Sequence, residues 1–144
     1  MQRIKHQPIG TAIIILNTNN QILLGKRKNA FKAGHYGLPG GRIKKGEKLL
    51  NAVNRELLEE TNLKAKNTRS LVVIKEWQEN EDQDFVHFLF VCTDWTNTLQ
   101  LMEPDKCEGW EWFNVDALPQ NILPGHLAGI NYLKNKESTG VLDF

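Results

Sequence analysis

The sequence has few cysteines, no long apolar run and almost no net charge. Its two cysteines, Cys92 and Cys107, form no CxxC pair, which argues against a disulfide framework and favours reduced thiols in the cytoplasm. The longest apolar run covers residues 12–16, far fewer than the roughly 20 residues that a membrane-spanning helix needs. The first residues also lack the apolar stretch of a signal peptide. We therefore expect a cytoplasmic protein without a membrane partner.

Charge of neither sign is in excess, since 18 Lys and Arg residues stand against 17 Asp and Glu residues. A general nucleic-acid-binding protein would carry a basic excess, so we expect no nucleic-acid partner. No repeat, low-complexity segment or linker interrupts the 144 residues. With 40% hydrophobic and 24% charged residues, positions 1–144 are predicted to form one domain whose core needs no disulfide.

Strand patterns and helix patterns both occur along the chain. Runs rich in β-branched and aromatic residues predict strands at residues 9–16, 21–27, 71–77, 85–92 and 110–113. Residues 17–20 have the composition of a turn, so we expect the first two strands to pair as a hairpin. Apolar residues at helical spacing predict helices at residues 48–62 and 127–136, and Asn62 is suited to end the first. Mixed elements of this kind indicate an α+β layered fold.

A glycine-rich stretch, residues 28–46, precedes the first predicted helix and is expected to be a long functional loop. On the helix, Glu56, Glu59 and Glu60 are spaced so that all three project from one side. Like charges this close repel each other, unless a hard divalent cation such as Mg²⁺ lies among the oxygens. Arg55 stands four residues before Glu59 and eight after Glu47, and either pairing would orient the acidic cluster.

A solvated helix face is the alternative explanation for the three glutamates. Two features weaken it. The acidic arc adjoins the apolar arc of Leu49, Leu50, Val53 and Leu57 instead of opposing it. The glycine-rich loop before the helix also allows backbone groups to approach a ligand closely.

Residues 41–63 carry a motif of fixed spacing: Gly41, five residues, Glu47, seven residues, Arg55-Glu56-Leu57-x-Glu59-Glu60, two residues and Leu63. This motif closely resembles the Nudix box of the Nudix hydrolase family. It departs at Asn62, where the family has Gly, and Asn is the next-best residue for a left-handed helix end. The resemblance implies a mixed β-sheet sandwiched between helices and hydrolysis of nucleoside diphosphates linked to another moiety, with Mg²⁺ or Mn²⁺ as cofactor.

The resemblance also implies roles for individual residues. Carried over by motif position, Glu56, Glu59 and Glu60 are the metal ligands, with Glu56 as the candidate general base and Glu59 as the next. Glu47 and Arg55 are expected to support them. The carbonyl of Gly40 or Gly41 is a further candidate ligand.

Other residues near the motif are candidates for metal or substrate binding. Arg27, at the end of a predicted strand, is the first candidate for phosphate contact, and Gly41 and Arg42 are expected to help bind the substrate. Glu108 is interpreted either as a loop carboxylate that reaches the metal or as a surface residue, with Glu103 and Asp105 as weaker candidates. His87 is expected to face a pocket or solvent, and His126 has no spacing partner.

Residues 25–28, 38–41 and 102–113 further resemble the Nudix subgroup that contains nucleotide triphosphate diphosphatase 15 and plant Nudix hydrolase 1, although residues 42–45 differ from it. This resemblance favours a pyrophosphohydrolase that cleaves nucleoside triphosphates, oxidised or modified deoxynucleotides included, to a monophosphate and pyrophosphate. The alternatives are hydrolysis of a nucleotide sugar, a dinucleoside polyphosphate or an isoprenyl diphosphate, or a nucleotide-binding sensor that has lost catalysis. A homodimer is left open.

Overall fold

A five-stranded mixed sheet forms the centre of the molecule. The structure is a computed structural model and describes residues 8–29, 32–135 and 141–143. The sheet has the order β10-β6-β7-β1-β4, with the bounds β1 (Ile9–Ile15), β4 (Gly40–Arg42), β6 (Arg69–Gln78), β7 (Gln83–Cys92) and β10 (Val141–Asp143). β1 pairs in parallel with β7 and antiparallel with β4, and it is buried from Gly10 to Ile15 because both faces of the sheet are covered.

Two smaller sheets flank the central one. The three-stranded sheet has the order β3-β2-β9, with the bounds β2 (Gln21–Arg27), β3 (Tyr36–Gly37) and β9 (Cys107–Asn114). The two-stranded sheet joins β5 (Lys64–Ala65) to β8 (Trp95–Thr96). A short 3₁₀ turn, η1 (Glu79–Glu81), connects β6 to β7.

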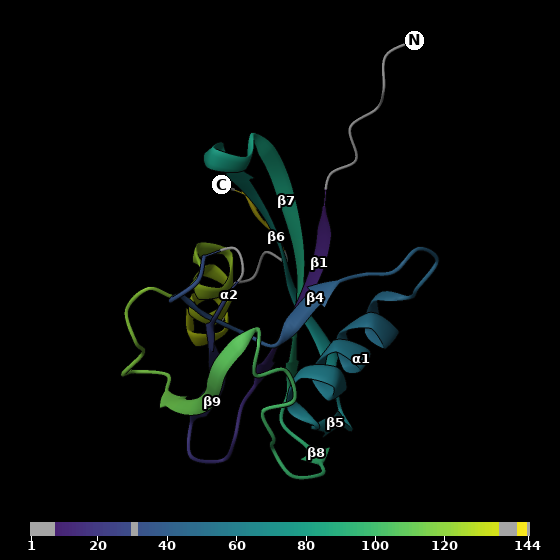
Figure 1. Cartoon of the computed structure of the whole chain (residues 1–144), viewed down its shortest axis with the longest axis vertical. Coiled ribbons are helices and arrows are strands. Elements are labelled where there is room, and N and C mark those ends of the chain that lie inside the picture. The colour runs from purple at the N-terminus through teal and green to yellow at the C-terminus, as the bar shows by residue number, and fades with distance from the viewer. Residues whose placement is uncertain (1–7, 30–31, 136–140, 144) are drawn as a thin grey trace.

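The helices α1 (Leu49–Thr61) and α2 (Pro124–Asn135) lie on opposite faces of the central sheet (Figure 1). Alternate residues of β1 serve the two faces: Ile13 packs with Val53 and Leu57 of α1, whereas Ile14 packs with Ile130 of α2. The predicted fold class, a mixed β-sheet sandwiched between helices, is confirmed. Within the described ranges, neither helix is long and apolar enough to cross a membrane.

The first predicted helix and its end are confirmed. α1 ends where Asn62 adopts the left-handed conformation, with φ 67°, and its N–H donates to the carbonyl of Leu58. Of the predicted apolar face, Val53 and Leu57 are buried, but Leu50 is exposed because it lies on the solvent side of the helix. The second helix begins three residues before the predicted start, and the predicted last residue, Lys136, lies outside the described residues.

The predicted hairpin of the first two strands is wrong. β1 and β2 belong to different sheets, and only an isolated antiparallel bridge between Leu16 and Ile22 joins their ends. The turn forms as its composition predicts, since Asn17 Oδ1 accepts N–H bonds from Asn19 and Gln21. The strands then separate, because β1 is paired on both edges by β4 and β7 while β2 pairs with β3 and β9. The predicted long loop likewise contains the short strands β3 and β4.

Candidate functional site

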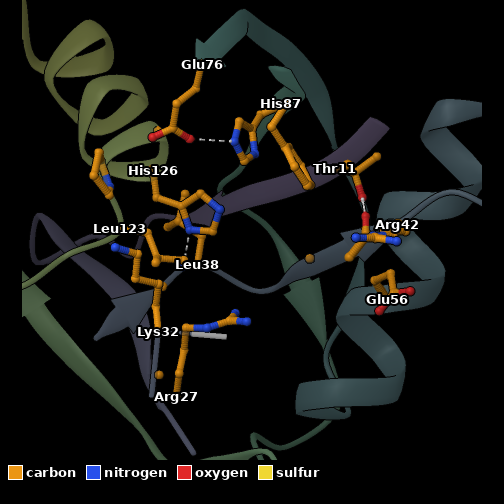
Figure 2. Close-up of a pocket in the computed structure, with 18 of the residues that line it drawn as sticks. Thr11, Arg27, Lys32, Leu38, Arg42, Glu56, Glu76, His87, Leu123 and His126 are labelled. Atoms are coloured by element: carbon orange, nitrogen blue, oxygen red, sulfur yellow. Dashed lines mark hydrogen bonds and ion pairs between the residues drawn. The ribbon is translucent and has the colours of Figure 1, made fainter. Parts of the chain in front are cut away.

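A cavity of about 890 Å³ lies between the three-stranded sheet, the open edge of the central sheet and the two helices, within the usual size range of a ligand site. Residues from α1 and β4 line one end, and residues from β6, β7 and the start of α2 line the other (Figure 2). The site residues predicted from sequence that line it are Arg27, Gly40, Gly41, Arg42, Glu56, Glu59 and Glu60.

The three box glutamates reach the cavity from one side of α1, as their spacing predicts. Glu60 Oε2 accepts a hydrogen bond of 3.1 Å from the backbone N–H of Gly40. Glu56 lies against Gly41 so closely that a Cβ on Gly41 would be 2.6 Å from Glu56 Cδ. The absence of a side chain at position 41 is therefore what allows β4 to lie beside the carboxylate of Glu56. The side chain of Glu59 is more open to solvent, with 49% of its area exposed.

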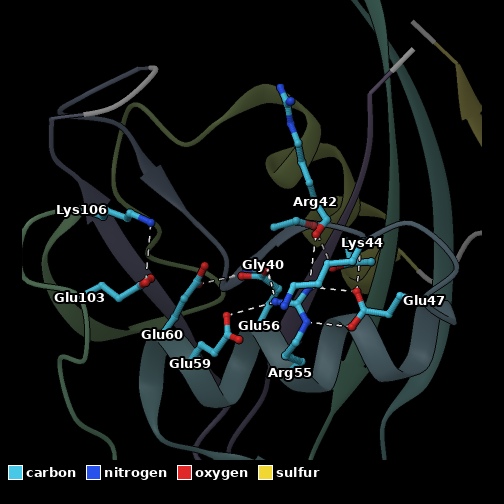
Figure 3. A network of polar contacts seen from close by, with 12 residues as sticks. Gly40, Arg42, Lys44, Glu47, Arg55, Glu56, Glu59, Glu60, Glu103 and Lys106 are labelled. Atoms are coloured by element: carbon cyan, nitrogen blue, oxygen red, sulfur yellow. Dashed lines mark hydrogen bonds and ion pairs between the residues drawn. The ribbon is translucent and has the colours of Figure 1, made fainter. Parts of the chain in front are cut away.

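Arg55 connects the acidic cluster to the loop before the helix (Figure 3). Its Nε and Nη2 bind both oxygens of Glu47 at 2.8 and 3.0 Å, while Nη1 binds Glu56 at 2.9 Å and Glu59 at 3.1 Å. Nη2 also donates to the carbonyl of Arg42 at 3.4 Å. Both pairings that the sequence offered for Arg55 thus occur together, through the planar fork of one guanidinium.

Hydrogen bonding to Arg55 lowers the pKa of Glu47 to about 2, and the backbone N–H of Lys44 adds to the effect. The same bond raises the pKa of Arg55. Both groups are charged throughout the neutral range. They form an ion pair whose guanidinium also bonds the carboxylates of Glu56 and Glu59.

Glu60 has the opposite electrostatic situation. Burial raises its pKa to about 8, opposed by the N–H of Gly40, and the nearby carboxylates of Glu56 and Glu103 raise it further. At neutral pH this carboxyl therefore holds a proton when no cation is near. A bound cation would reverse that preference, because it would supply the positive charge that the cluster lacks.

The donor set of the cluster is composed of oxygen atoms, which suits a hard cation such as Mg²⁺ or Mn²⁺. Among the described residues, no three His, Cys, Asp or Glu side chains already converge as a metal-binding group. Arg55 holds Glu56 and Glu59, and Gly40 holds Glu60. The residues fit such a metal in kind, because the cavity wall at this end carries carboxylate and backbone carbonyl oxygens.

The loop that follows β8 is attached to the C-terminal end of α1. The carbonyl of Glu60 accepts bonds from Trp110 Nε1 at 3.1 Å and from the N–H of Met102 at 3.4 Å. This attachment brings Glu103 to the cavity wall, where it forms an ion pair of 3.7 Å with Lys106. The structure does not bring Glu108 to the cluster. Its side chain is 49% exposed and pairs with Lys26 at 3.7 Å.

The two predicted arginines differ in position. Arg27 lines the cavity at the end of β2, and burial lowers the pKa of its guanidinium, opposed by the charge of Glu60. Arg42 also lines the cavity, but in Figure 3 its side chain extends away from the glutamates. Arg27 is thus the better placed of the two to face a phosphate beside the acidic cluster.

The far end of the cavity holds residues to which the sequence analysis assigned no role. Glu76 on β6 is almost buried, and its Oε1 lies 3.2 Å from Nε2 of His87 on β7. His126, at the start of α2, accepts the N–H of Leu38 at Nδ1, and burial lowers its pKa to about 3. The prediction that His87 faces a pocket or solvent is confirmed for the pocket. The available signal for it was a single polar residue between Val86 and Phe88 in the otherwise apolar residues 85–92.

Comparison with known proteins identifies the family. A model of the NUDIX domain matches residues 6–133 of the chain. The chain belongs to the NUDIX family, and it is a Nudix hydrolase. It is 33% identical over 126 residues to a putative 8-oxo-dGTP diphosphatase of Bacillus subtilis (strain 168), an alignment that covers 88% of this chain and 79% of that protein.

Other relatives have other named activities. An ADP-ribose pyrophosphatase of Methanocaldococcus jannaschii is 33% identical over 106 residues, which cover 74% of this chain and 62% of that protein. Among solved structures, a MutT NUDIX hydrolase from Burkholderia pseudomallei superposes with a TM-score of 0.84 at 28% identity, covering 88% of this chain and 98% of that one. Two relatives at 33% identity therefore have different named substrates.

Proposed function

We propose that the chain is a divalent-cation-dependent pyrophosphohydrolase that cleaves nucleoside triphosphates, oxidised or modified deoxynucleotides included, to a monophosphate and pyrophosphate. The observation that carries the proposal is the continuity of one cavity from the α1 carboxylates and Arg27 to a largely buried polar end at β6 and β7. Phosphates fit the first end and a base fits the second. The resemblance to the triphosphate-cleaving subgroup and the name of the Bacillus subtilis relative favour the same substrate class.

In this proposal Glu56, Glu59 and Glu60, with a carbonyl of Gly40 or Gly41, hold Mg²⁺ or Mn²⁺. The bound metal would supply charge neutralisation and a more acidic water. Glu56 is the group in this proposal that accepts a proton from the attacking water, because the neighbouring guanidinium of Arg55 cannot accept one at working pH. Arg27 binds the phosphate chain through two parallel N–H groups, and Arg55 holds Glu56 in place.

The second candidate is a hydrolase of ADP-ribose or of another diphosphate-linked nucleotide. The relative from Methanocaldococcus jannaschii favours it, since that protein is named an ADP-ribose pyrophosphatase at the same level of identity. The chemistry at the carboxylates is unchanged in this case. What differs is the group that leaves with the second phosphate.

The test is product analysis with Mg²⁺ and with EDTA, using dGTP, 8-oxo-dGTP, dATP, ADP-ribose and an isoprenyl diphosphate. We expect triphosphates to yield monophosphate and pyrophosphate with Mg²⁺ and nothing in EDTA.

Glu56→Gln should lose at least about a hundredfold in kcat while still binding nucleotide, and raised pH should restore part of the rate. The exposed Glu111→Gln, which removes the same charge away from the cavity, is the control. Faster cleavage of ADP-ribose would favour the second candidate, and binding without turnover of any substrate would indicate a sensor.

We also propose that the 144 residues act as one domain in the cytoplasm on a small nucleotide, alone or as a homodimer. Both cysteines are free, and Cys92 is buried in the core, as suits a reducing compartment.

A further inference from the structure

We propose that Glu76 is a specificity-determining residue that selects guanine-type bases, because it places an almost buried carboxylate beside the rings of Phe85 and His87 at the end of the cavity opposite the α1 glutamates. This inference rests on the proposed function, since it names the base of the nucleotide that the same cavity would hold. The box motif contributes nothing to this end of the cavity, which is built from β6, β7 and α2.

The local geometry holds Glu76 in one orientation. Its side chain is 11% exposed, and its Oε1 lies 3.2 Å from His87 Nε2 and 3.4 Å from Gln78 Nε2. Both of these contacts are made to Oε1. One oxygen is therefore committed to the protein, and the second keeps its lone pairs for a ligand in the cavity.

The ring wall beside Glu76 is formed by neighbours on the sheet. Phe85 is the direct cross-strand partner of Glu76, and the rings of Phe85 and His87 stack with centroids 4.5 Å apart. Gly125 lets the start of α2 close over this group, because a Cβ there would lie 3.0 Å from His87 Nε2 and 3.2 Å from Glu76 Oε1. A flat ring wall next to a fixed acceptor is the arrangement that reads the edge of a base.

The distance between the two ends of the cavity suits a nucleotide. Sheet order places β6 three strands from β4, through β1 and β7, and neighbouring strands lie about 4.8 Å apart, so these two strands, each of which contributes residues to one end of the cavity, are about 14 Å apart. Figure 2 shows Glu56 and Glu76 at opposite sides of the cavity. A base that extends through its ribose from phosphates held at Glu56 therefore arrives beside Glu76.

The charge of Glu76 decides which base fits. Hydrogen bonding from His87 lowers the pKa of Glu76 and keeps it ionised, so it can only accept hydrogen bonds. Guanine presents two adjacent donors, its N1–H and its 2-amino group. Adenine and cytosine place a ring acceptor beside their amino group, and that acceptor would face the carboxylate. The edge of guanine is unchanged in its 8-oxo form, so this contact accepts both.

The test compares bases that differ by one donor. Binding of GMP, IMP and AMP to the metal-free full chain is measured by calorimetry, and kcat/KM is measured for dGTP, dITP and dATP. We expect GMP to bind roughly tenfold to a hundredfold more tightly than IMP, which lacks only the 2-amino group, because a hydrogen bond to a charged group is lost. The discrimination against AMP should be larger. Equal affinity for GMP and IMP in the natural chain overturns the inference without any variant.

Glu76→Gln should reduce the GMP preference over IMP to within about threefold, whereas the control Glu81→Gln, at the exposed rim of the same cavity, should keep it. Glu76→Asp withdraws the same charge by one methylene and should give an intermediate ratio. If Glu76→Gln keeps the full preference for GMP over IMP, the role of Glu76 is overturned. Hydrolysis of all triphosphates without base preference would leave the proposed function intact and remove this inference. A GMP preference without any triphosphate hydrolysis would remove the proposed function and leave the role of Glu76 in base selection.

Discussion

Arg55 restrains the carboxylates of Glu56 and Glu59, which the proposed mechanism needs. It does so with a planar guanidinium, whose separate nitrogens a single charged nitrogen cannot replace. We expect Arg55→Lys to lower kcat about tenfold to a hundredfold, since loss of a group that orients metal ligands commonly has an effect of this size. A lysine ammonium carries its donors on a single nitrogen, so it cannot reproduce the bonds that Nε, Nη1 and Nη2 make to Glu47, Glu56 and Glu59. The measurement is kcat as a function of Mg²⁺ concentration, with the exposed Lys48→Arg as control. A rate within twofold of the natural chain would show that Arg55 has no positioning role.

Glu103 and Glu108 lie five residues apart and have different surroundings. Glu103 lines the cavity and raises the pKa of Glu60, whereas Glu108 is exposed and paired with Lys26. We expect Glu103→Gln to lower kcat at least about tenfold and Glu108→Gln to leave it within about twofold. The two variants serve as controls for each other in the same assay. The reverse order of effects would restore Glu108 as the loop carboxylate that reaches the metal.

Strand β4 contains two consecutive glycines with different neighbours. A Cβ at Gly40 would overlap the backbone of Thr11 and Ala12, whereas a Cβ at Gly41 would meet the end of the Glu56 side chain. We expect Gly40→Ala to destabilise the fold by about 3 kcal/mol or more, because backbone atoms cannot move aside. Gly41→Ala should fold but lose activity, since it displaces Glu56. Urea denaturation and kcat measured on both variants check the contrast, and a stable, active Gly40→Ala would contradict it.

Helix α1 ends at a residue that departs from the family motif. Asn62 has a positive φ, its side chain donates to the carbonyl of Thr98, and its own carbonyl accepts from Asn97. We expect Asn62→Ala to destabilise the chain by about 1–2 kcal/mol, because alanine has no such tolerance of the left-handed conformation. Asn62→Gly should cost less, since it loses only the bond to Thr98. The midpoint of urea denaturation is the measurement, and equal effects of both changes would show that the backbone conformation is not what Asn62 supplies.

Elements were predictable from sequence where a local pattern determines them. α1 follows from its apolar spacing and from Asn62, and β1, β6, β7 and β9 follow from their β-branched and aromatic residues. Pairing was not predictable, since the turn after β1 is compatible with a hairpin as well as with two strands that enter different sheets. What decides between them is the pairing of both edges of β1, one with β4 and one with β7, which come later in the chain.

The candidate site divides in the same way. Most of its acidic end comes from a contiguous segment, residues 40–60, and helical spacing predicted that Glu56, Glu59 and Glu60 project from one side. Its other end joins Glu76, His87 and His126 from three elements, and none of these residues has a local pattern that points to the others. Such a group becomes visible only when the register of β6 on β7 and the position of α2 are known.

The stability of the whole metal-free molecule should depend on pH in three ranges. The pKa of Glu47 is about 2 instead of 4.5, and that of His126 is about 3 instead of 6.5. The unfolded chain therefore binds more protons than the folded chain at acidic pH. Stability falls as the pH drops below about 6.5 through His126, and below about 4.5 through Glu47 as well. Glu60 has a pKa of about 8, above its usual 4.5, so its contribution is lost as the pH rises from 4.5 to 8. Between about 4.5 and 6.5 the effects of His126 and Glu60 oppose each other. The protein should therefore be most stable there, with losses on both sides.

Denaturation midpoints measured from pH 3 to 9 in EDTA and in Mg²⁺ check this profile. Mg²⁺ should remove the alkaline loss, because it binds the ionised form of Glu60. Glu60→Gln should remove the same loss without metal, and the exposed Glu111→Gln should not. An alkaline loss that persists in Glu60→Gln would assign it to another group.

The parallel pairing of β1 with β7 also determines when this chain can fold during its synthesis. Ile9 pairs with Val86, which lies 77 positions further along the chain. At about 5–20 residues per second, the ribosome makes that partner roughly 4–15 s after the first strand. Until then one edge of Ile9–Ile15, an almost entirely apolar strand, has only the backbone of the unfinished chain and water beside it. The nascent protein is thus exposed to aggregation for several seconds, and any fragment that stops before residue 83 lacks the strand that completes its central sheet.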